Sequence, residues 1–317
     1  MVRRGKRRCP AGKRIFRFFE ELGAEVVTTG RANKKIVDEG VRRTVNDTCF
    51  PIKVLTGHVV ELSGVCDALF LPSIRSLREG SYNCSKFLGL PDITRALVPE
   101  APEIIEADIE IPKGKRDLYI EILKVGRRFT ANPIRIKRAS ERAWKAYKEY
   151  RKLMREERLT PPEAMDKLYG KDAHGWKRGR INIGIVGHPY VLYDEFINHN
   201  ILKKLRDMDV SFLTPEMIPE EEACSEVMRL VGRFYWTYED EVTGAGGYFI
   251  KSGDIDGVIC LVPFGCGPDS LMTGLLKTEA KRVKKPFMIL SFDEHTAEAG
   301  IITRLEAFID MILRRGG

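Results

Sequence analysis

Residues 181–187 read INIGIVG, and residues 256–262 read DGVICLV. In each stretch a short apolar run ends at Gly187 or just before Pro263, and a helix-like segment follows. Runs of this kind are typical of strands that are buried on both faces of a parallel sheet. The alternation of strands and helices therefore predicts an α/β fold, with parallel sheets that are covered by helices.

The same alternation extends over most of the chain. In the C-terminal half, strands are expected at 181–186, 210–213, 256–262 and 286–291, and helices at about 193–208, 220–232, 270–283 and 297–315. In the N-terminal part, helices are expected at 14–22, 52–62 and 91–98, and strands or β-rich stretches at 25–28, 68–71 and 104–111. Two α/β lobes of similar size follow from this pattern.

A different segment separates the two lobes. Residues 134–158 are rich in Lys, Arg, Glu and aromatic residues, with Trp144, Tyr147 and Leu153 at helical spacing. This pattern predicts a long amphipathic helix whose charges form its solvated face. The expected division is a basic arm (1–13), a first lobe (14–132), a helical linker (133–178) and a second lobe (179–317).

Composition restricts the class of protein. The chain has 317 residues, of which 43% are hydrophobic, and it contains no apolar run of the roughly 18 residues that a membrane span requires. The N-terminus is basic but lacks the apolar segment of a signal peptide. Seven cysteines, an odd number in a long chain, do not indicate a disulfide framework. We therefore expect a cytoplasmic protein with reduced thiols.

The net charge of +8 comes from the N-terminal arm. The first 19 residues contain eight Lys or Arg and no acidic residue, whereas the other 45 basic residues balance the 45 acidic ones. Such an arm can bind the phosphates of nucleic acid. The interpretation that we favour is a solvated terminus, so nucleic acid is an unlikely partner.

Three cysteines occupy similar places in the sequence. Cys49, Cys84 and Cys266 lie in loops that contain Gly, Pro or polar residues, and a helix-like stretch follows each. In an α/β protein, loops at the carboxyl edge of the sheet are where ligands bind. Thiolates bind zinc, copper(I) and iron–sulfur clusters. The three cysteines are thus predicted metal ligands, although each alone could be a small buried apolar residue.

A helix start should also influence these thiols. The predicted helices begin just after Cys49 and Cys266, and free backbone N–H groups there are expected to lower the thiol pKa. Cys66 and Cys260 are expected to be structural because they lie at or within strands. Cys9 belongs to the basic arm, and Cys224 remains an outside candidate on a helix.

Several polar residues lie near the same predicted edges. A catalytic interpretation would use them for proton transfer beside the metal, whereas the alternative is that they cap helices and bind loop backbones, above all Asp293 and Thr296. The candidates are Lys53, His58, His188, Asp269, Glu294 and His295. The segment 244–247 (GAGG) lacks the ending of a phosphate-binding loop, and no nucleotide-hydrolysis motif is found.

These residues form part of a longer signature that resembles a known family. The matching segments are TCFPIK (48–53), GHV (57–59), FLP (70–72), NC (83–84), GHPY (187–190), FGCGPDS (264–270), DEHT (293–296) and TRLEAF (303–308). They look like those of proteins described as CoA-substrate-specific enzyme activase-related, or acyl-CoA dehydratase activase-related. Such proteins are similar to the cluster-bearing subunits of 2-hydroxyacyl-CoA dehydratases and to double-cubane-cluster reductases. The resemblance runs from about residue 14 to the end.

The resemblance implies two flavodoxin-like (Rossmann-like) lobes with an oxygen-sensitive iron–sulfur cluster between them. It implies that Cys49, Cys84 and Cys266 bind a [4Fe–4S]-type cluster, and that an ATP-hydrolysing partner of actin-like fold supplies low-potential electrons. We expect that partner to be a separate activase. The N-terminus departs from the family pattern, because residues 3–17 are basic where relatives have an apolar first strand.

The expected function is therefore ATP-gated electron transfer or reduction in anaerobic metabolism, by a protein whose status as an enzyme stays open. The alternative is a metal-stabilised scaffold or regulator without catalytic activity, which binds nucleic acid through its basic arm. The substrate, the nuclearity of the cluster, a fourth ligand and a homodimeric state are not determined by the sequence.

Overall fold

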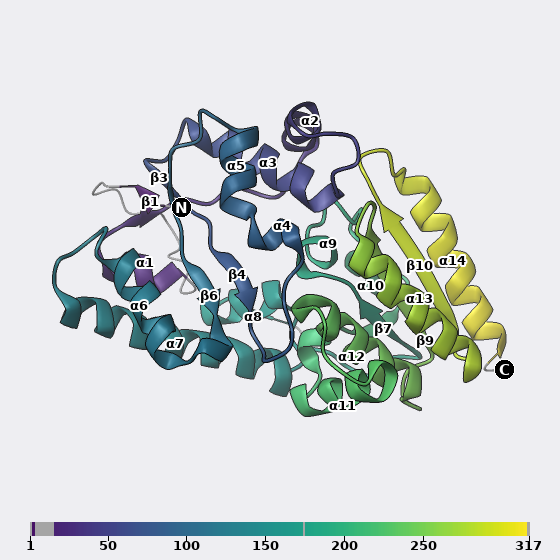
Figure 1. The fold of residues 1–317 in the computed structure, drawn as a ribbon. Helices are drawn as coiled ribbons and strands as arrows, with labels where there is room; N and C mark the ends of the chain where they lie inside the picture. Colours follow the sequence, from purple (N-terminus) through teal and green to yellow (C-terminus); the bar gives the residue numbers. More distant parts are fainter. Residues whose placement is uncertain (1, 4–15, 174, 316–317) are drawn as a thin grey trace.

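The computed structural model describes residues 2–3, 16–173 and 175–315. It shows an α/β protein with parallel sheets, as predicted, in which two lobes lie side by side and a long helix runs along the lower side of the first (Figure 1). In the part of the chain that the structure describes, no helix is long and apolar enough to cross a bilayer.

The second lobe contains a four-stranded parallel sheet. Its strands are β7 (Ile181–Val186), β8 (Val210–Leu213), β9 (Gly257–Pro263) and β10 (Phe287–Phe292), in the order β10-β9-β7-β8. This is the strand order of a flavodoxin-like sheet. From β7 the chain adds β8 on one side and β9 on the other, so the direction in which strands are added reverses between β7 and β9. Ligands bind in α/β proteins outside the carboxyl ends of the strands at such a reversal. The loops after β7 and β9 are therefore the expected place for a site.

Helices cover both faces of this sheet. Residues of α10 (Ile201–Asp207) and α14 (Glu298–Arg315) pack with Ile259 on one face. Those of α12 (Thr237–Lys251) and α13 (Gly267–Arg282) pack with Cys260 on the other. The alternate residues of β9 thus reach two separate cores, which explains why this strand is apolar throughout.

The first lobe has a smaller, mixed sheet. Its order is β2-β1-β3-β5, where β1 runs antiparallel to both neighbours and β3 is parallel to β5. The strands are β1 (Val2–Arg3), β2 (Glu25–Val26), β3 (Ala68–Phe70) and β5 (Glu103–Ile105), with β4 (Ser73–Ser76) and β6 (Asp108–Glu110) as a separate parallel pair. Apart from residues 2–3, the predicted basic arm (1–13) lies outside the described residues.

The helices of the first lobe also lie on both sides of its sheet. They are α1 (Arg17–Glu21), α2 (Lys34–Arg43), α3 (Phe50–Ser63), α4 (Ser85–Leu88), α5 (Leu90–Leu97) and α6 (Lys115–Gly126), with a 3-10 turn, η2 (Ile111–Lys113). Phe19 and Val125 pack on one face beside Ala68, whereas Val59 and Leu62 pack on the other beside Leu69. The helix α3 therefore forms part of the core of this lobe.

The linker segment forms two helices, α7 (Pro133–Glu156) and α8 (Pro161–Leu168). The side chain of Asn132 caps α7, which contacts α1, α6 and the 3-10 turn η3 (Pro215–Met217). At its far end Arg155 pairs with Glu220, the first residue of α11 (Glu220–Val231). The predicted long amphipathic helix is confirmed, and it reaches both lobes.

The two lobes also share a core. Phe50 and Val54, from the first half of α3, belong to the same hydrophobic cluster as Ile183 and Ile259 of the second sheet. Further along α3, Val59 and Leu62 pack into the first lobe. One helix is thus buried in both lobes, which holds its N-terminus at the junction between them.

Two predictions about the second lobe are wrong. Of the helix expected at about 193–208, only the C-terminal part forms, as α10, and residues 193–200 form an irregular turn after the short helix α9 (Pro189–Leu192). The side chains of Asp194 and Asn198 bind backbone groups within that turn and so compete with the helix. His199, expected inside the helix, lies in the turn with a φ of 54°.

Candidate functional site

The three predicted cysteine ligands line one cavity. Cys49, Cys84 and Cys266 are the residues that immediately precede α3, α4 and α13, respectively. All three contribute to the wall of a cavity of about 180 Å³. Two of them come from the first lobe and one from the second, so the cavity exists only because the lobes are packed together.

Backbone contacts hold Cys49 close to Cys266. The N–H of Phe50 donates a hydrogen bond of 3.1 Å to the carbonyl of Phe264. Between Phe264 and Cys266, Gly265 has a φ of +79°, and a Cβ there would lie 3.1 Å from the Cα of Cys49. Only glycine combines that backbone conformation with such a close approach at little cost. The glycine between Phe264 and Cys266 is therefore required for the two loops to approach this closely.

The loop that carries Cys84 is held by the preceding residue. The side chain of Asn83 donates a hydrogen bond to the carbonyl of Ile74, and its backbone N–H donates to Arg75. Tyr82 exchanges backbone hydrogen bonds with residues 235 and 237 of the second lobe. The loop thus connects strand β4 to the start of α12, and this places Cys84 at the junction.

The remaining cavity wall is largely apolar and aromatic. It consists of Pro51, Ile52, Leu55, Phe87, Leu90, Tyr190 and Tyr238, with Asn83, Lys86, His188 and Glu239 as its polar members. The ring of Phe87 lies 5.2 Å from that of Tyr238 and 6.4 Å from that of Tyr190, measured between centroids. Such a wall keeps water away from the thiols.

The thiols are free and half-buried. Burial raises the pKa of Cys49 despite a backbone N–H of the helix N-terminus that lowers it. Burial and the nearby carboxylate of Asp269 raise the pKa of Cys266 as well. The prediction that the helix start would lower these pKa values is therefore wrong, because desolvation outweighs the helix N–H groups. A bound cation would supply the charge that favours the thiolates.

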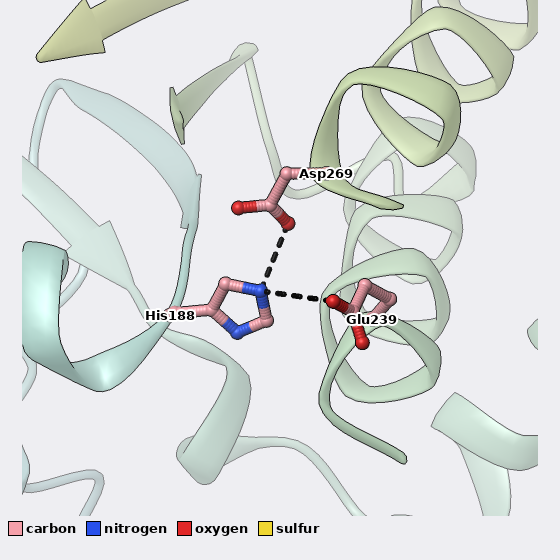
Figure 2. Close-up of side chains that lie close together, drawn as sticks. All are labelled: His188, Glu239 and Asp269. Atoms are coloured by element: carbon pink, nitrogen blue, oxygen red, sulfur yellow. Dashed lines mark ion pairs between the residues drawn. The ribbon is translucent and has the colours of Figure 1, made fainter. Parts of the chain in front are cut away.

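A second cluster of polar residues lies beside the cysteines. His188 follows β7, Glu239 is in the first turn of α12, and Asp269 is in the first turn of α13 (Figure 2). The Nε2 atom of His188 is 2.9 Å from Oδ1 of Asp269 and 3.8 Å from Oε1 of Glu239. The side chains are between 2% and 6% exposed. All three side chains of the cluster are therefore almost completely buried.

Aromatic rings and charges surround His188. Its ring stacks on Tyr190 with centroids 5.1 Å apart, and it meets the edge of Tyr238. Burial acts to lower the pKa of His188, but the Asp269 carboxylate reverses this and leaves the pKa raised. Burial also raises the pKa of Glu239, although His188 acts in the opposite direction. The cluster therefore holds ionisable groups in an apolar setting.

The other predicted candidates lie away from the cavity wall. Lys53 and Glu294 form a buried ion pair with each other, 2.5 Å long, across the lobe junction. His58 lies further along α3, where burial lowers its pKa. His295 is exposed, and its backbone N–H donates to Asp293. The structure therefore brings His188 to the cysteines, with Asp269 behind it, but not these four residues.

The other cysteines lie elsewhere. Cys260 is 1% exposed within β9, and Cys66 is buried just before β3. Cys224 lies on α11, where it lines a different pocket. Cys9 is outside the described residues.

Sequence reasoning missed Glu239, Tyr190 and Tyr238. Glu239 and Tyr238 lie in α12, a helix that the sequence does not predict because its interior contains three glycines and one threonine, which have low helix propensity. One signal was present: acidic residues 239–241 are followed by an apolar segment, which is typical of a helix N-terminus. In the sequence, Tyr190 is marked only by its place in the segment GHPY (187–190).

The residues present suit an iron–sulfur cluster. The donor set consists of three free thiols from separate loops, in an apolar cavity that backbone contacts have already assembled. The Oδ1 atom of Asn83 is buried there without a hydrogen-bond partner. Thiolates that bind different irons of one cluster need not approach as closely as ligands of a single ion. Three cysteines leave one position open in a Cys₄ arrangement.

Comparison with known protein families gives one match. The CoA enzyme activase uncharacterised domain (DUF2229) matches residues 12–218, which is about two thirds of the chain. The chain belongs to this family. The matched region includes Cys49, Cys84 and His188, whereas Cys266 lies beyond it. No curated protein matches the chain.

Proposed function

We propose that this protein binds an iron–sulfur cluster of the [4Fe–4S] type through Cys49, Cys84 and Cys266. The observation that carries the proposal is the position of these three cysteines. They precede three different helices in two lobes, and yet they line the same cavity. Cysteines with only packing roles would not be expected to meet in this way.

When bound, such a cluster would supply one-electron chemistry at low potential. The residues of the chain would hold the cluster and control its surroundings. Phe87, Tyr190 and Tyr238 would exclude water, which affects cluster potential. Lys86, on the cavity wall, would offset negative charge on the thiolates. The space left in the cavity would hold a substrate or a fourth ligand.

The proposed task is ATP-gated electron transfer or reduction in a system like that of the 2-hydroxyacyl-CoA dehydratases. A separate activase of actin-like fold would deliver the electrons, since no phosphate-binding motif occurs in this sequence. The cytoplasm is the proposed compartment, because thiols stay reduced there.

Anaerobic purification provides the test. The wild-type protein is expected to be brown and to contain iron and acid-labile sulfide in similar amounts. Cys49→Ala, Cys84→Ala and Cys266→Ala should each lose iron and the visible absorption, whereas Cys224→Ala, a half-buried cysteine outside the cavity, should keep both. If any of the three variants retains iron and an unchanged spectrum, that cysteine is not a ligand.

Metal analysis of the same samples tests the alternative scaffold function. A colourless protein that contains zinc but no sulfide would contradict the cluster and favour a metal-stabilised scaffold. Most of the basic arm, on which that alternative depends, lies outside the described residues.

A further inference from the structure

We infer that His188, Glu239 and Asp269 form a second, separate binding site, for one divalent transition-metal ion. The inference does not depend on the cluster, because it uses none of the three cysteines. The possible ligand atoms of the three residues all lie within 4.8 Å of one another. Figure 2 shows both carboxylates directed toward Nε2 of His188.

The distances suit a shared ion. Atoms that each lie about 2.1 Å from one metal are roughly 3–4 Å apart. The observed distances from Nε2 of His188 to the two carboxylates are 2.9 Å and 3.8 Å. One nitrogen and two carboxylate oxygens form a donor set that suits Zn²⁺, Fe²⁺, Mn²⁺ or Co²⁺.

The hydrogen bonding of the cluster is incomplete. Oδ2 of Asp269 is buried and has no hydrogen-bond partner, and Nε2 of His188 makes no hydrogen bond of good geometry although it forms an ion pair with Oδ1 of Asp269. Buried polar groups nearly always have partners, so groups that lack them indicate a missing ligand. Both unsatisfied atoms belong to residues whose side chains are at most 3% exposed.

The charge of the cluster is also unbalanced. Among the described residues, neither Glu239 nor Asp269 forms an ion pair with a lysine or arginine; His188 is the partner of both. Two buried carboxylates near one imidazole are costly unless a cation or protons compensate them. A divalent ion would compensate both and would use the unsatisfied atoms as well.

Access to the site is available from the cysteine cavity. His188 and Glu239 line that cavity, and Asp269 lies one turn after Cys266 on α13. A bound ion would therefore lie at the wall of the same cavity, on the side of the second lobe. It would place a Lewis acid next to the space that a substrate would occupy.

Cobalt binding provides the test. The triple variant Cys49→Ala/Cys84→Ala/Cys266→Ala is titrated with Co²⁺ in the absence of iron. We expect one equivalent to bind, with visible bands of nitrogen and oxygen ligation and no thiolate charge-transfer band. Adding His188→Gln, Glu239→Gln or Asp269→Asn should weaken binding by at least about tenfold, since even supporting residues of metal sites have effects of that size.

Matched controls make the result specific. His199→Gln and Glu222→Gln, which lie outside the cluster, should leave Co²⁺ binding unchanged. If the triple variant does not fold, the wild-type thiols are blocked by S-methylthiolation and the same titration is repeated. Absence of Co²⁺ binding, or binding by the His188→Gln and Asp269→Asn variants that equals that of their parent, would overturn the inference. The charges of the two buried carboxylates would then be compensated by protons and not by a metal ion. Neither outcome affects the cluster proposal, which iron and sulfide analysis tests.

Discussion

Cys260 and Cys266 are six residues apart, yet their surroundings differ greatly. Cys260 lies inside β9, and its sulfur is 3.4 Å from the hydroxyl of Thr273. Burial raises its pKa to about 12, so it remains a thiol. Cys266 follows the end of the same strand and opens onto the cavity. Position along the strand therefore separates a packing role from the proposed ligand role.

This difference can be tested by removing each sulfur. Cys260→Ala should lower the free energy of unfolding by about 1 kcal/mol or more through lost packing, but it should keep the iron. Chemical denaturation and iron analysis of the same preparation are the measurements. Cys224 is half-buried on α11, so Cys224→Ala should change the free energy of unfolding by less than about 0.5 kcal/mol. Loss of iron from folded Cys260→Ala protein would show that β9 is wrongly placed relative to the cavity.

Asp293 gives a pH-dependent prediction at the same scale. Burial acts to raise its pKa, but hydrogen bonds from Thr296 and the backbone N–H of His295 leave the pKa lowered. A carboxyl with a lowered pKa stabilises the fold above its unfolded pKa of 3.8, and this stability is lost as the pH falls through the lower, folded value. Asp293→Ala removes the acceptor of both hydrogen bonds and should cost about 1 kcal/mol at pH 7.

Thermal unfolding between pH 2 and pH 7 checks this prediction. The difference between wild type and Asp293→Ala should shrink at the acid end, as Asp293 becomes protonated. Asp293→Asn keeps an acceptor oxygen without the charge, so its difference from wild type should be smaller at pH 7. A destabilisation by Asp293→Ala that is equal at every pH would show that the carboxylate charge has no part in it.

At the scale of elements, α3 is the helix on which the site most depends. Its N-terminus carries Cys49, its first half packs into the second lobe and its second half into the first. Gly40 of α2 and Gly57 of α3 let the two helices cross in backbone contact. A Cβ at Gly57 would lie 1.8 Å from the carbonyl oxygen of Ile36.

Gly57→Ala should therefore be strongly destabilising. The two backbones would have to separate, which we expect to cost about 3 kcal/mol or more. Because α3 would move with Cys49, bound iron should fall as well. Gly64→Ala, at the end of the same helix, is the control: nothing lies within 4 Å of its Cβ position, so stability should be nearly unchanged. Equal stability of the two variants would contradict the close crossing.

The elements also show what the sequence could and could not predict. The buried strands and α3 follow from apolar runs and helical spacing, and the three cysteine loops follow from Gly and Pro at the strand and helix ends. The sequence does not predict the helix α12, because glycines 244, 246 and 247 lower its helix propensity. Those glycines lie against Ala223, Leu276 and Leu230, and such tertiary contacts are not visible in one sequence.

Side-chain partners were harder to predict than positions. His58 follows Cys49 by nine residues, which is half a turn beyond two full turns, so it points away from the side that carries Cys49. Lys53 is on nearly the same side as Cys49, but it turns to Glu294 across the lobe junction. The sequence places residues on elements, but it does not show which partner a long side chain selects.

At the scale of the whole molecule, the two lobes are joined by buried contacts rather than by the linker alone. The Lys53–Glu294 pair, the backbone bridge at Tyr82 and the shared core around Phe50 all cross the junction. A cavity that depends on such a junction opens if the lobes separate. The site is therefore sensitive to lobe packing, and a partner that changes the packing would change access to it.

The whole molecule also bears on the source of energy for reduction. The one glycine-rich segment that resembles a phosphate loop, residues 244–247, lies inside α12 and is buried against neighbouring side chains. Its backbone N–H groups are used by the helix, so they cannot surround a phosphate as a loop after a strand does. Among the described residues, this segment therefore offers no site for ATP.

We accordingly expect no ATP hydrolysis by the purified protein, and reduction of the proposed cluster only when a cognate activase, ATP and a strong reductant are present together. Phosphate release by the protein alone is measured first, and the visible spectrum is then followed with each component omitted in turn. Cys84→Ala, which should lack the cluster, controls for reduction of the activase itself. ATP turnover by the isolated chain, or full reduction without the activase, would contradict this division of roles, because the energy would then come from this protein and not from its partner.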